Sequence, residues 1–173
     1  AVIGVTEVAT ALLNTLDESP VDMSLLRLLL QAGSADVNLL DGAITKSAIR
    51  NPDPKVLELV LGLGRPSSDT ITRCLTELGS LPSNEGKTWK LNIILSKSTR
   101  KQNLGDLLIS EIQWLMKDRK HDRSRARSFS TLKQLLSSGA DPNAYNASAV
   151  QNAIKNTDAQ VIDILFASEH KPS

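Results

Sequence analysis

Residues 135–146 read "LLSSGADPNAYN", and a looser version of the same pattern, "LLQAGSADVNLLD", occupies residues 29–41. When Gly33 is aligned with Gly139, a pair of leucines precedes each glycine and an Ala-Asp-X-Asn turn follows it, with Ser34 as a single insertion. The agreement continues without a gap from "SAIRNPDPKVLEL" at 47–59 to "NAIKNTDAQVIDI" at 152–164. Agreement over so many positions indicates a true internal repeat.

The spacing of the glycines sets the size of the repeated unit. The interval from Gly33 to Gly139 accommodates three units of about 35 residues, and Gly64 matches the same position in a further unit. We therefore predict a single repeat domain over residues 1–170, followed by a tail at 171–173. Its units are expected at approximately 1–40, 41–66, 67–102, 103–143 and 144–170.

Each unit is interpreted as two short helices. Asp41-Gly42 can open the first helix of one unit, and Asn51-Pro52 ends it because proline removes a backbone donor. Pro54 suits the first turn of the next helix. The glycines are interpreted as helix terminators able to take the left-handed conformation. No stretch alternates with period two, so the predicted fold is an all-α helical-repeat solenoid of about five helix pairs.

The central helices are predicted from apolar stripes at helical spacing. The residues expected to face the core there are Ile71, Cys74, Leu75 and Leu78; then Trp89, Leu91, Ile94 and Leu95; then Leu104, Leu107, Leu108, Ile112, Leu115 and Met116.

The pattern "LLxxGADxN", followed by Ala-Ile about ten positions later and an aliphatic helix that ends before glycine, resembles the ankyrin repeat. The chain departs from that family in its Thr-Pro-Leu-His start, where Ala43-Ile44-Thr45 and Ser148-Ala149-Val150 stand instead. The interior repeats are degenerate, because Gly64-Arg65-Pro66 and the 79–86 and 117–127 connections lack the Gly-Ala-Asp turn. The resemblance implies a non-enzymatic scaffold within a larger intracellular protein, of the kind that filamentous fungi also contain. It also implies that partners bind to the concave side, which the first helix of each pair and the preceding turn line.

On that analogy the candidate partner-binding residues are polar side chains of the first helices, together with one exposed tyrosine at a turn. They are Lys46, Arg50, Tyr145, Gln151 and Lys155. The function expected is protein–protein interaction through this face. A structural or autoinhibitory spacer, packed against neighbouring domains of the same protein, is the alternative.

The composition fits this class of protein. Hydrophobic residues make up 40% of the 173 residues, charged residues 23%, aromatic residues 3%, and the formal net charge is +1. A disordered chain would be less apolar, and a general nucleic-acid binder would be more basic. The single cysteine suits a reducing compartment, cytoplasmic or nuclear, and no apolar run is long enough to span a membrane. The start, "AVIGVTEVATALLNTL", lacks the basic region of a signal peptide, so we expect the edge of a longer protein.

No motif predicts catalysis, a metal or a cofactor. Gly86-Lys87-Thr88 matches the end of a phosphate-binding loop, but position 81 is leucine where that loop requires glycine, and no strand precedes it. His121 and His170 lie in a charged segment and in the last four residues, so with Cys74 they supply neither a zinc site nor a nucleophile with its base. We expect no catalytic, cofactor-binding or metal-binding residue.

The segment "KDRKHDRSRARS" at 117–128 is locally basic. Its cations, which outnumber Asp118 and Asp122, are Lys117, Arg119, Lys120, Arg123, Arg125 and Arg127. We expect a solvated loop between helices. The alternatives are a contact with phosphate or an acidic partner, a nuclear-localisation run, or a switch at Ser128, a candidate phosphosite with Arg125 three residues before it. Without interleaved aromatic residues, nucleic-acid contact through this loop is the less favoured possibility.

Overall fold

The computed structural model describes the chain except for residues 1–3, 33–34, 99–102, 122–127, 157 and 169–173. Ten α-helices and a 3-10 turn form the described part, which contains no β-strand. In chain order they are α1 (Val5–Asp17), α2 (Met23–Gln31), η1 (Leu40–Gly42), α3 (Ala43–Arg50), α4 (Pro54–Leu63), α5 (Ser68–Ser80), α6 (Glu85–Lys97), α7 (Gly105–His121), α8 (Ser130–Ser137), α9 (Ala144–Lys155) and α10 (Ala159–Phe166). The predicted all-α class is confirmed.

The helices belong to two compact units. Unit 1 comprises Ala1–Leu78 and Trp89–Lys101, and unit 2 comprises Gly79–Thr88 and Gln102–Ser173. The boundary therefore passes through α5 and α6. The last two residues of α5 and the first four of α6 belong to unit 2, and the rest of both helices belongs to unit 1.

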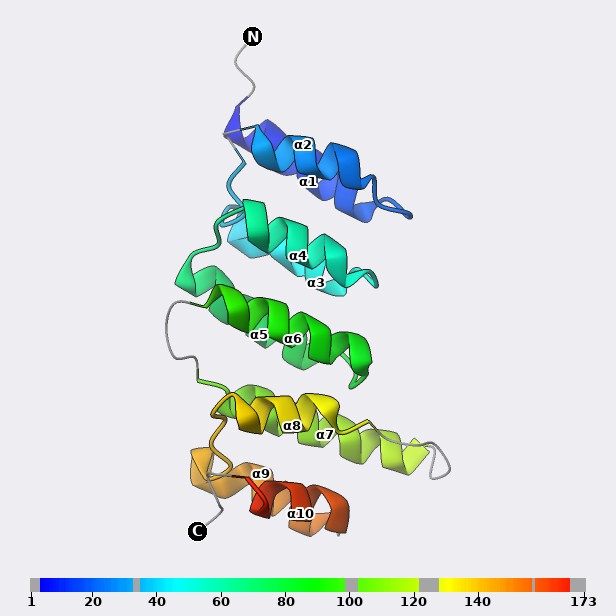
Figure 1. Cartoon of the computed structure of the whole chain (residues 1–173), viewed down its shortest axis with the longest axis vertical. Coiled ribbons are helices and arrows are strands. Elements are labelled where there is room, and N and C mark those ends of the chain that lie inside the picture. The colour runs from blue at the N-terminus through cyan, green and yellow to red at the C-terminus, as the bar shows by residue number, and fades with distance from the viewer. Residues whose placement is uncertain (1–3, 33–34, 99–102, 122–127, 157, 169–173) are drawn as a thin grey trace. The chain divides into compact units, whose positions relative to one another are not determined.

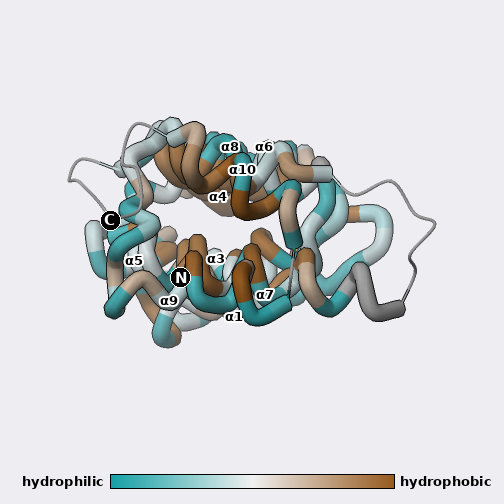
Figure 2. Tube along the Cα trace, turned by 90° about the horizontal axis from the view of Figure 1, so that it is seen from below, coloured by the Kyte–Doolittle hydropathy of each residue, from teal (hydrophilic) through white to brown (hydrophobic). Residues whose placement is uncertain are grey.

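In unit 1, consecutive helices form pairs, and equivalent helices of successive pairs lie against each other. Helix α1 contacts both α2 and α3, while α4 contacts both α3 and α2. This places α1 beside α3 in one layer and α2 beside α4 in the other (Figure 1). The apolar segments of α1, α3 and α4 face the space between the layers (Figure 2), where Leu12, Leu26, Ile44, Ile49, Leu57 and Leu61 are buried.

Unit 2 also pairs consecutive helices and places the first helices of successive pairs against each other. Helix α7 contacts α8 and α9, and α9 contacts α10. The stripe predicted along α7, from Leu104 to Met116, is buried as expected, together with Leu132, Leu135, Val161 and Leu165 of the neighbouring helices.

Several helix ends are formed by the residues that the sequence singled out. Gly42 has a φ of +73° directly before α3, and Pro54 is the first residue of α4, after the N-cap Asp53. Gly139 has a φ of +89° after α8. The Gly139 amide donates to Leu136 O and the Ala140 amide to Leu135 O, each at 3.0 Å, which is the bonding pattern of a Schellman motif.

Gly64 ends α4 for a different reason from the one predicted. Its φ is −78°, so it is not left-handed. A Cβ at this position would lie 2.3 Å from Val37 Cγ1 and 2.6 Å from Val60 O. Glycine is therefore required because the α2–α3 connection packs directly onto the end of α4. Gly33, the third predicted terminator, lies outside the described residues.

Candidate functional site

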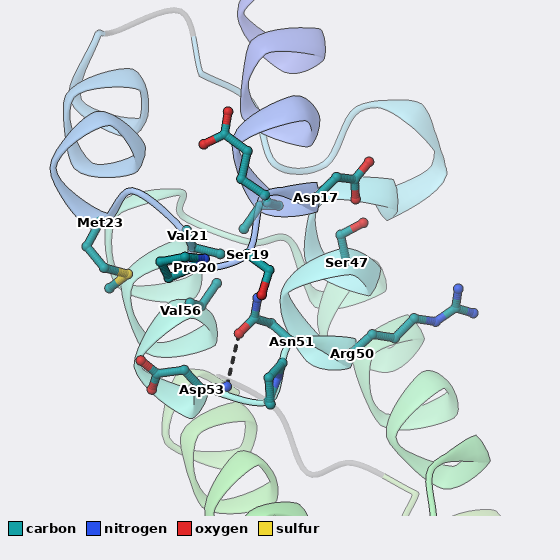
Figure 3. Close-up of a pocket in the computed structure, with 13 residues that line it drawn as sticks. Asp17, Ser19, Pro20, Val21, Met23, Ser47, Arg50, Asn51, Asp53 and Val56 are labelled. Atoms are coloured by element: carbon teal, nitrogen blue, oxygen red, sulfur yellow. Dashed lines mark hydrogen bonds between the residues drawn. The ribbon is translucent and has the colours of Figure 1, made fainter.

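Unit 1 contains a cleft of about 550 Å³ beside the turns that join α1 to α2 and α3 to α4 (Figure 3). We refer to it as the turn cleft. Its lining residues are Leu16, Asp17, Glu18, Ser19, Pro20, Val21, Met23, Ser47, Arg50, Asn51, Pro52, Asp53 and Val56.

Local hydrogen bonds hold both turns that border the cleft. Asp22 caps α2 by accepting from the Ser24 amide at 2.9 Å and from the Leu25 amide at 3.0 Å. On the other turn, Asn51 Oδ1 accepts from the Asp53 amide at 3.0 Å (Figure 3). The N-cap Asp22 satisfies backbone donors that a helix start leaves open, and Asn51 closes an Asx turn between α3 and α4. The cleft is consequently bordered by ordered backbone.

One wall of the cleft is apolar. Leu16 from α1 and Val56 from α4 line it and are buried. Pro20, Val21 and Met23 line it as well and lie close together beside Val56 (Figure 3). Such a wall suits the aliphatic part of a side chain, which can lie along apolar surface while its polar end stays at the rim.

The rim of the cleft carries acidic groups at an unfavourable place. Asp17 is the last residue of α1 and Glu18 its C-cap, and the last turn of that helix holds no basic residue. The end of a helix is its negative pole, so a carboxylate there costs about 0.3–1 kcal/mol. Among the described residues, neither Asp17 nor Glu18 forms an ion pair. Within the described part of the chain, neither carboxylate is therefore neutralised by a direct ion pair, and Arg50, which lines the same cleft, pairs with Glu77 instead.

Arg50, a predicted contact residue, lies at the edge of this cleft in the last turn of α3. Its Nε lies 2.6 Å from Glu77 Oε1, so a carboxylate of α5 already neutralises it. Its side chain is nevertheless two-thirds exposed to solvent, at 67%.

Lys46 lies one turn earlier on α3, also in unit 1, with its Nζ 3.5 Å from Asp41 Oδ2. Arg73 of α5 pairs with the other oxygen of Asp41. The structure therefore brings Lys46 and Arg50 onto the same helix, each beside an acidic partner. Arg73 was missed, because its proximity to Asp41 depends on how α5 packs.

The other three predicted contact residues lie in unit 2, on α9. The Tyr145 hydroxyl donates to Asp106 Oδ2 at 3.2 Å and accepts from Asn103 Nδ2 at 3.0 Å. Its ring lies so close to the start of α7 that a Cβ on Gly105 would lie 2.9 Å from Tyr145 Cε2. Tyr145 is 47% exposed and has a φ of +54°, as part of a left-handed turn that also includes Asn146 and Ala147.

Gln151 and Lys155 follow on the same helix and are both exposed. Gln151 Nε2 donates to Asn146 O at 2.8 Å, which ties it to the left-handed turn. Lys155 lies in the last turn, where a cation complements the negative end of the helix.

The basic segment differs from the predicted loop. Helix α7 continues to His121, so Lys117, Arg119 and Lys120 are helical, and the expectation of a loop from 117 was wrong. The helix can continue this far because residues 117–121 include no glycine or proline and are compatible with a helix. Lys117 Nζ lies 4.9 Å from the centroid of the Trp114 ring, a cation–π contact. Arg123, Arg125 and Arg127 lie outside the described residues.

Ser128, the candidate phosphosite, is half-buried just before α8. Its hydroxyl lies 2.8 Å from that of Ser130, which in turn lies 2.8 Å from the Thr88 hydroxyl. The Ser128 hydroxyl thus belongs to a hydrogen-bonded cluster in unit 2.

Two buried lysines of α6 are a feature that sequence reasoning missed. Lys87 Nζ lies 2.9 Å from Glu111 Oε2 and donates to Leu81 O at 2.8 Å, within unit 2. Lys90 Nζ donates to Ile49 O and Asn51 O, both at 2.6 Å, within unit 1. Burial lowers the pKa of Lys90. Their burial could have been predicted from spacing, because Lys87 lies four residues before Leu91 and Lys90 four residues before Ile94, on the same helix face.

Trp89, predicted to face the core, is instead 51% exposed. The prediction was wrong because the buried face of α6 contains Lys87, Lys90, Leu91 and Ile94, and Trp89 lies outside this face.

Cys74 is buried in α5, where burial raises the pKa of its thiol to about 11. Within the described residues, no group of three histidine, cysteine or acidic side chains is placed to hold a metal ion. None of the helices described is long and apolar enough to cross a bilayer.

No family model, curated protein or solved structure matches this chain.

Proposed function

We propose that the chain is a non-enzymatic protein-binding module, an ankyrin-like array of degenerate repeats. Two findings support the repeat: the aligned segments 47–59 and 152–164, and the contact of first helices with first helices, α1 with α3 and α7 with α9. Arrays of this kind bind partners through surfaces made by several successive repeats.

The observation that carries the proposal is the turn cleft. Its volume of about 550 Å³ lies in the range of ~300–1,000 Å³ that pockets for small molecules occupy, which leaves room for a side chain of a partner. It combines an apolar wall with a polar rim, and the capped turns hold both in place. A preformed site loses little conformational entropy on binding, which favours affinity.

In this proposal the partner extends from the cleft over the adjacent surface of α3, where Lys46 and Arg50 lie. The Lys46–Asp41 pair is exposed, so it contributes at most about 1 kcal/mol and Lys46 can exchange partners, whereas Arg50 pairs with a Glu77 side chain that is only 13% exposed. Tyr145, Gln151 and Lys155 would provide the corresponding surface in unit 2.

Photocrosslinking of the full chain tests the proposal. The side chain of p-benzoylphenylalanine is introduced at Ser19, which lines the cleft, or at Thr6, an exposed residue in the first turn of α1, the helix that precedes Ser19. We expect a discrete crosslinked product from the Ser19 position only. This product should disappear when an excess of the chain without p-benzoylphenylalanine is added as a competitor. Equal crosslinking from Thr6, or none from Ser19, would contradict binding at the cleft.

A structural spacer is the second candidate, favoured by exposed leucines on α2. Leu25 is 39% exposed and Leu28 is 65% exposed, on the helix that carries the buried Leu26 and Leu30. If this face packs against a neighbouring part of a larger protein, replacing Leu28 with glutamine raises the solubility of the chain and leaves crosslinking from Ser19 unchanged. An unchanged solubility would argue against the spacer role.

A further inference from the structure

The chain uses buried lysines to satisfy the carbonyl groups at the ends of its helices. At the end of α3, Lys90 Nζ donates to the carbonyls of Ile49 and Asn51, which no further helical turn can satisfy. Beyond the end of α5, Lys87 Nζ donates to Leu81 O and pairs with Glu111. A cation is favourable at both places because the end of a helix is its negative pole.

The end of α1 has no corresponding lysine among the described residues. When α4 is aligned with α6 by its buried positions, Leu57 matches Leu91 and Val60 matches Ile94, all fully buried. In this register Val56 takes the position of Lys90, the residue that reaches the end of α3. Valine is too short to reach the carbonyls at the end of α1.

The turn cleft lies at this place. Val56 and the end of α1, including Leu16 and Asp17, line the same hollow. The ends of α1 and α3 also differ in charge. The last turn of α3 carries a favourable cation, Arg50, whereas α1 ends with the carboxylates of Asp17 and Glu18. The position without a lysine, the hollow and the two carboxylates therefore coincide: the hollow provides room for a side chain, and the carboxylates favour a cationic one.

We propose that the turn cleft binds a lysine side chain from a basic segment of a protein partner. The aliphatic stem lies along the wall of Pro20, Val21 and Met23, and the carboxylates of Asp17 and Glu18 neutralise the ammonium group. This assignment rests on the proposed function and adds the chemistry of the partner. The chain's net charge is only +1, so a basic peptide experiences no general attraction to it.

Peptide titration provides the first test. The ¹⁵N-labelled chain is titrated with Ac-Ala-Lys-Ser-Lys-Ala-NH₂ and with the same peptide acetylated at both lysine Nζ atoms. We expect saturable shifts of the Asp17, Glu18, Ser19 and Asn51 amides with the first peptide, and at least tenfold weaker binding of the second. Equal binding of the two peptides, no binding of either, or shifts confined to other amides would overturn the assignment.

A graft within the chain provides the second test. Val56→Lys places a lysine at the position equivalent to Lys90, and Val56→Met places an uncharged side chain of similar length there. We expect Val56→Lys to melt at least as high as Val56→Met and to block the lysine peptide by tenfold or more. The melting temperature of Val56→Lys relative to Val56→Met should fall when Asp17→Asn and Glu18→Gln are introduced as well. If Val56→Lys melts well below Val56→Met in both backgrounds, the cleft does not accept an ammonium group.

The crosslink at Ser19 separates this inference from the proposed function. In the Asp17→Asn, Glu18→Gln variant, a retained crosslink together with failed peptide binding shows that the cleft binds a partner by other chemistry, which overturns the lysine assignment alone. Loss of both the crosslink and peptide binding in this variant supports the lysine assignment, whereas their absence in the unaltered chain overturns both proposals.

Discussion

The ion pair between Lys87 and Glu111 makes a stringent test of how unit 2 is held together. The Lys87 side chain is 1% exposed and the Glu111 side chain 0%, with the two charged groups 2.9 Å apart. The Ser83 hydroxyl donates to the second oxygen of Glu111 at 2.5 Å. Replacing Lys87 with methionine keeps most of the side-chain volume but leaves a buried carboxylate without its cation.

The expected destabilisation follows from that burial. Removing one member of a buried pair costs about 3–5 kcal/mol, because the remaining charge is neither solvated nor neutralised. Replacing both members with apolar residues of similar size is often close to neutral. Lys87→Met with Glu111→Leu still loses hydrogen bonds to Leu81 O and from Ser83, at about 1 kcal/mol each. The double variant should therefore lie within about 2 kcal/mol of the unaltered protein.

Urea unfolding of the four proteins in this double-mutant cycle gives the coupling energy directly. We expect each single variant to lose at least about 3 kcal/mol and the coupling between the two positions to exceed about 2 kcal/mol. Lys133→Met, at an exposed position of α8, serves as the control and should change stability by less than about 0.5 kcal/mol. Two single variants that each lie within 1 kcal/mol of the unaltered protein would show that the pair is not buried as described.

Further tests concern unit 1. Gly64→Ala should lose about 1–3 kcal/mol because its Cβ meets Val37, whereas Gly62→Ala, with no atom within 4 Å, should gain about 0.5–1 kcal/mol in the same urea assay. Equal effects would contradict the close approach at Gly64. Cys74, with its pKa raised from 9.0 to about 11, should react with iodoacetamide at pH 8 at least about 100-fold more slowly in the native chain than in urea. Because the pKa of Lys90 is lowered from 10.5 on folding, the unfolded chain binds more protons just below pH 10.5, so stability rises as pH increases toward that value. Lys90→Met should flatten this part of the stability–pH curve, and an unchanged slope would contradict the burial of Lys90.

Local rules account for what the sequence predicted well. The backbone at Gly42, Pro54 and Gly139 follows from the allowed dihedral angles of glycine and proline, which need no knowledge of distant contacts. Apolar spacing likewise identified the buried face of α7 and the all-helical class.

The remaining features depend on contacts between helices that are distant in sequence. Lys90 is buried because α6 places it against the end of α3, 39 residues away at Asn51. The turn cleft requires two turns from successive pairs to lie side by side. Neither follows from the periodicity of one segment, and a lysine within an apolar stripe is ordinarily expected to point to solvent.

The paired state of Lys46 and Arg50 bears on how a contact surface is inferred from exposed charges. Each lies on α3 and is neutralised by an acidic side chain, Asp41 or Glu77. The Lys46–Asp41 pair is exposed and contributes little, so a partner's carboxylate can replace Asp41 at small cost, whereas the largely buried Glu77 holds Arg50 more firmly. Asp17 and Glu18 differ because no described cation neutralises them and the end of α1 adds to their charge. A cation arriving there gains interaction energy without first breaking a pair, so the acidic rim is a stronger candidate contact than the exposed cations beside it.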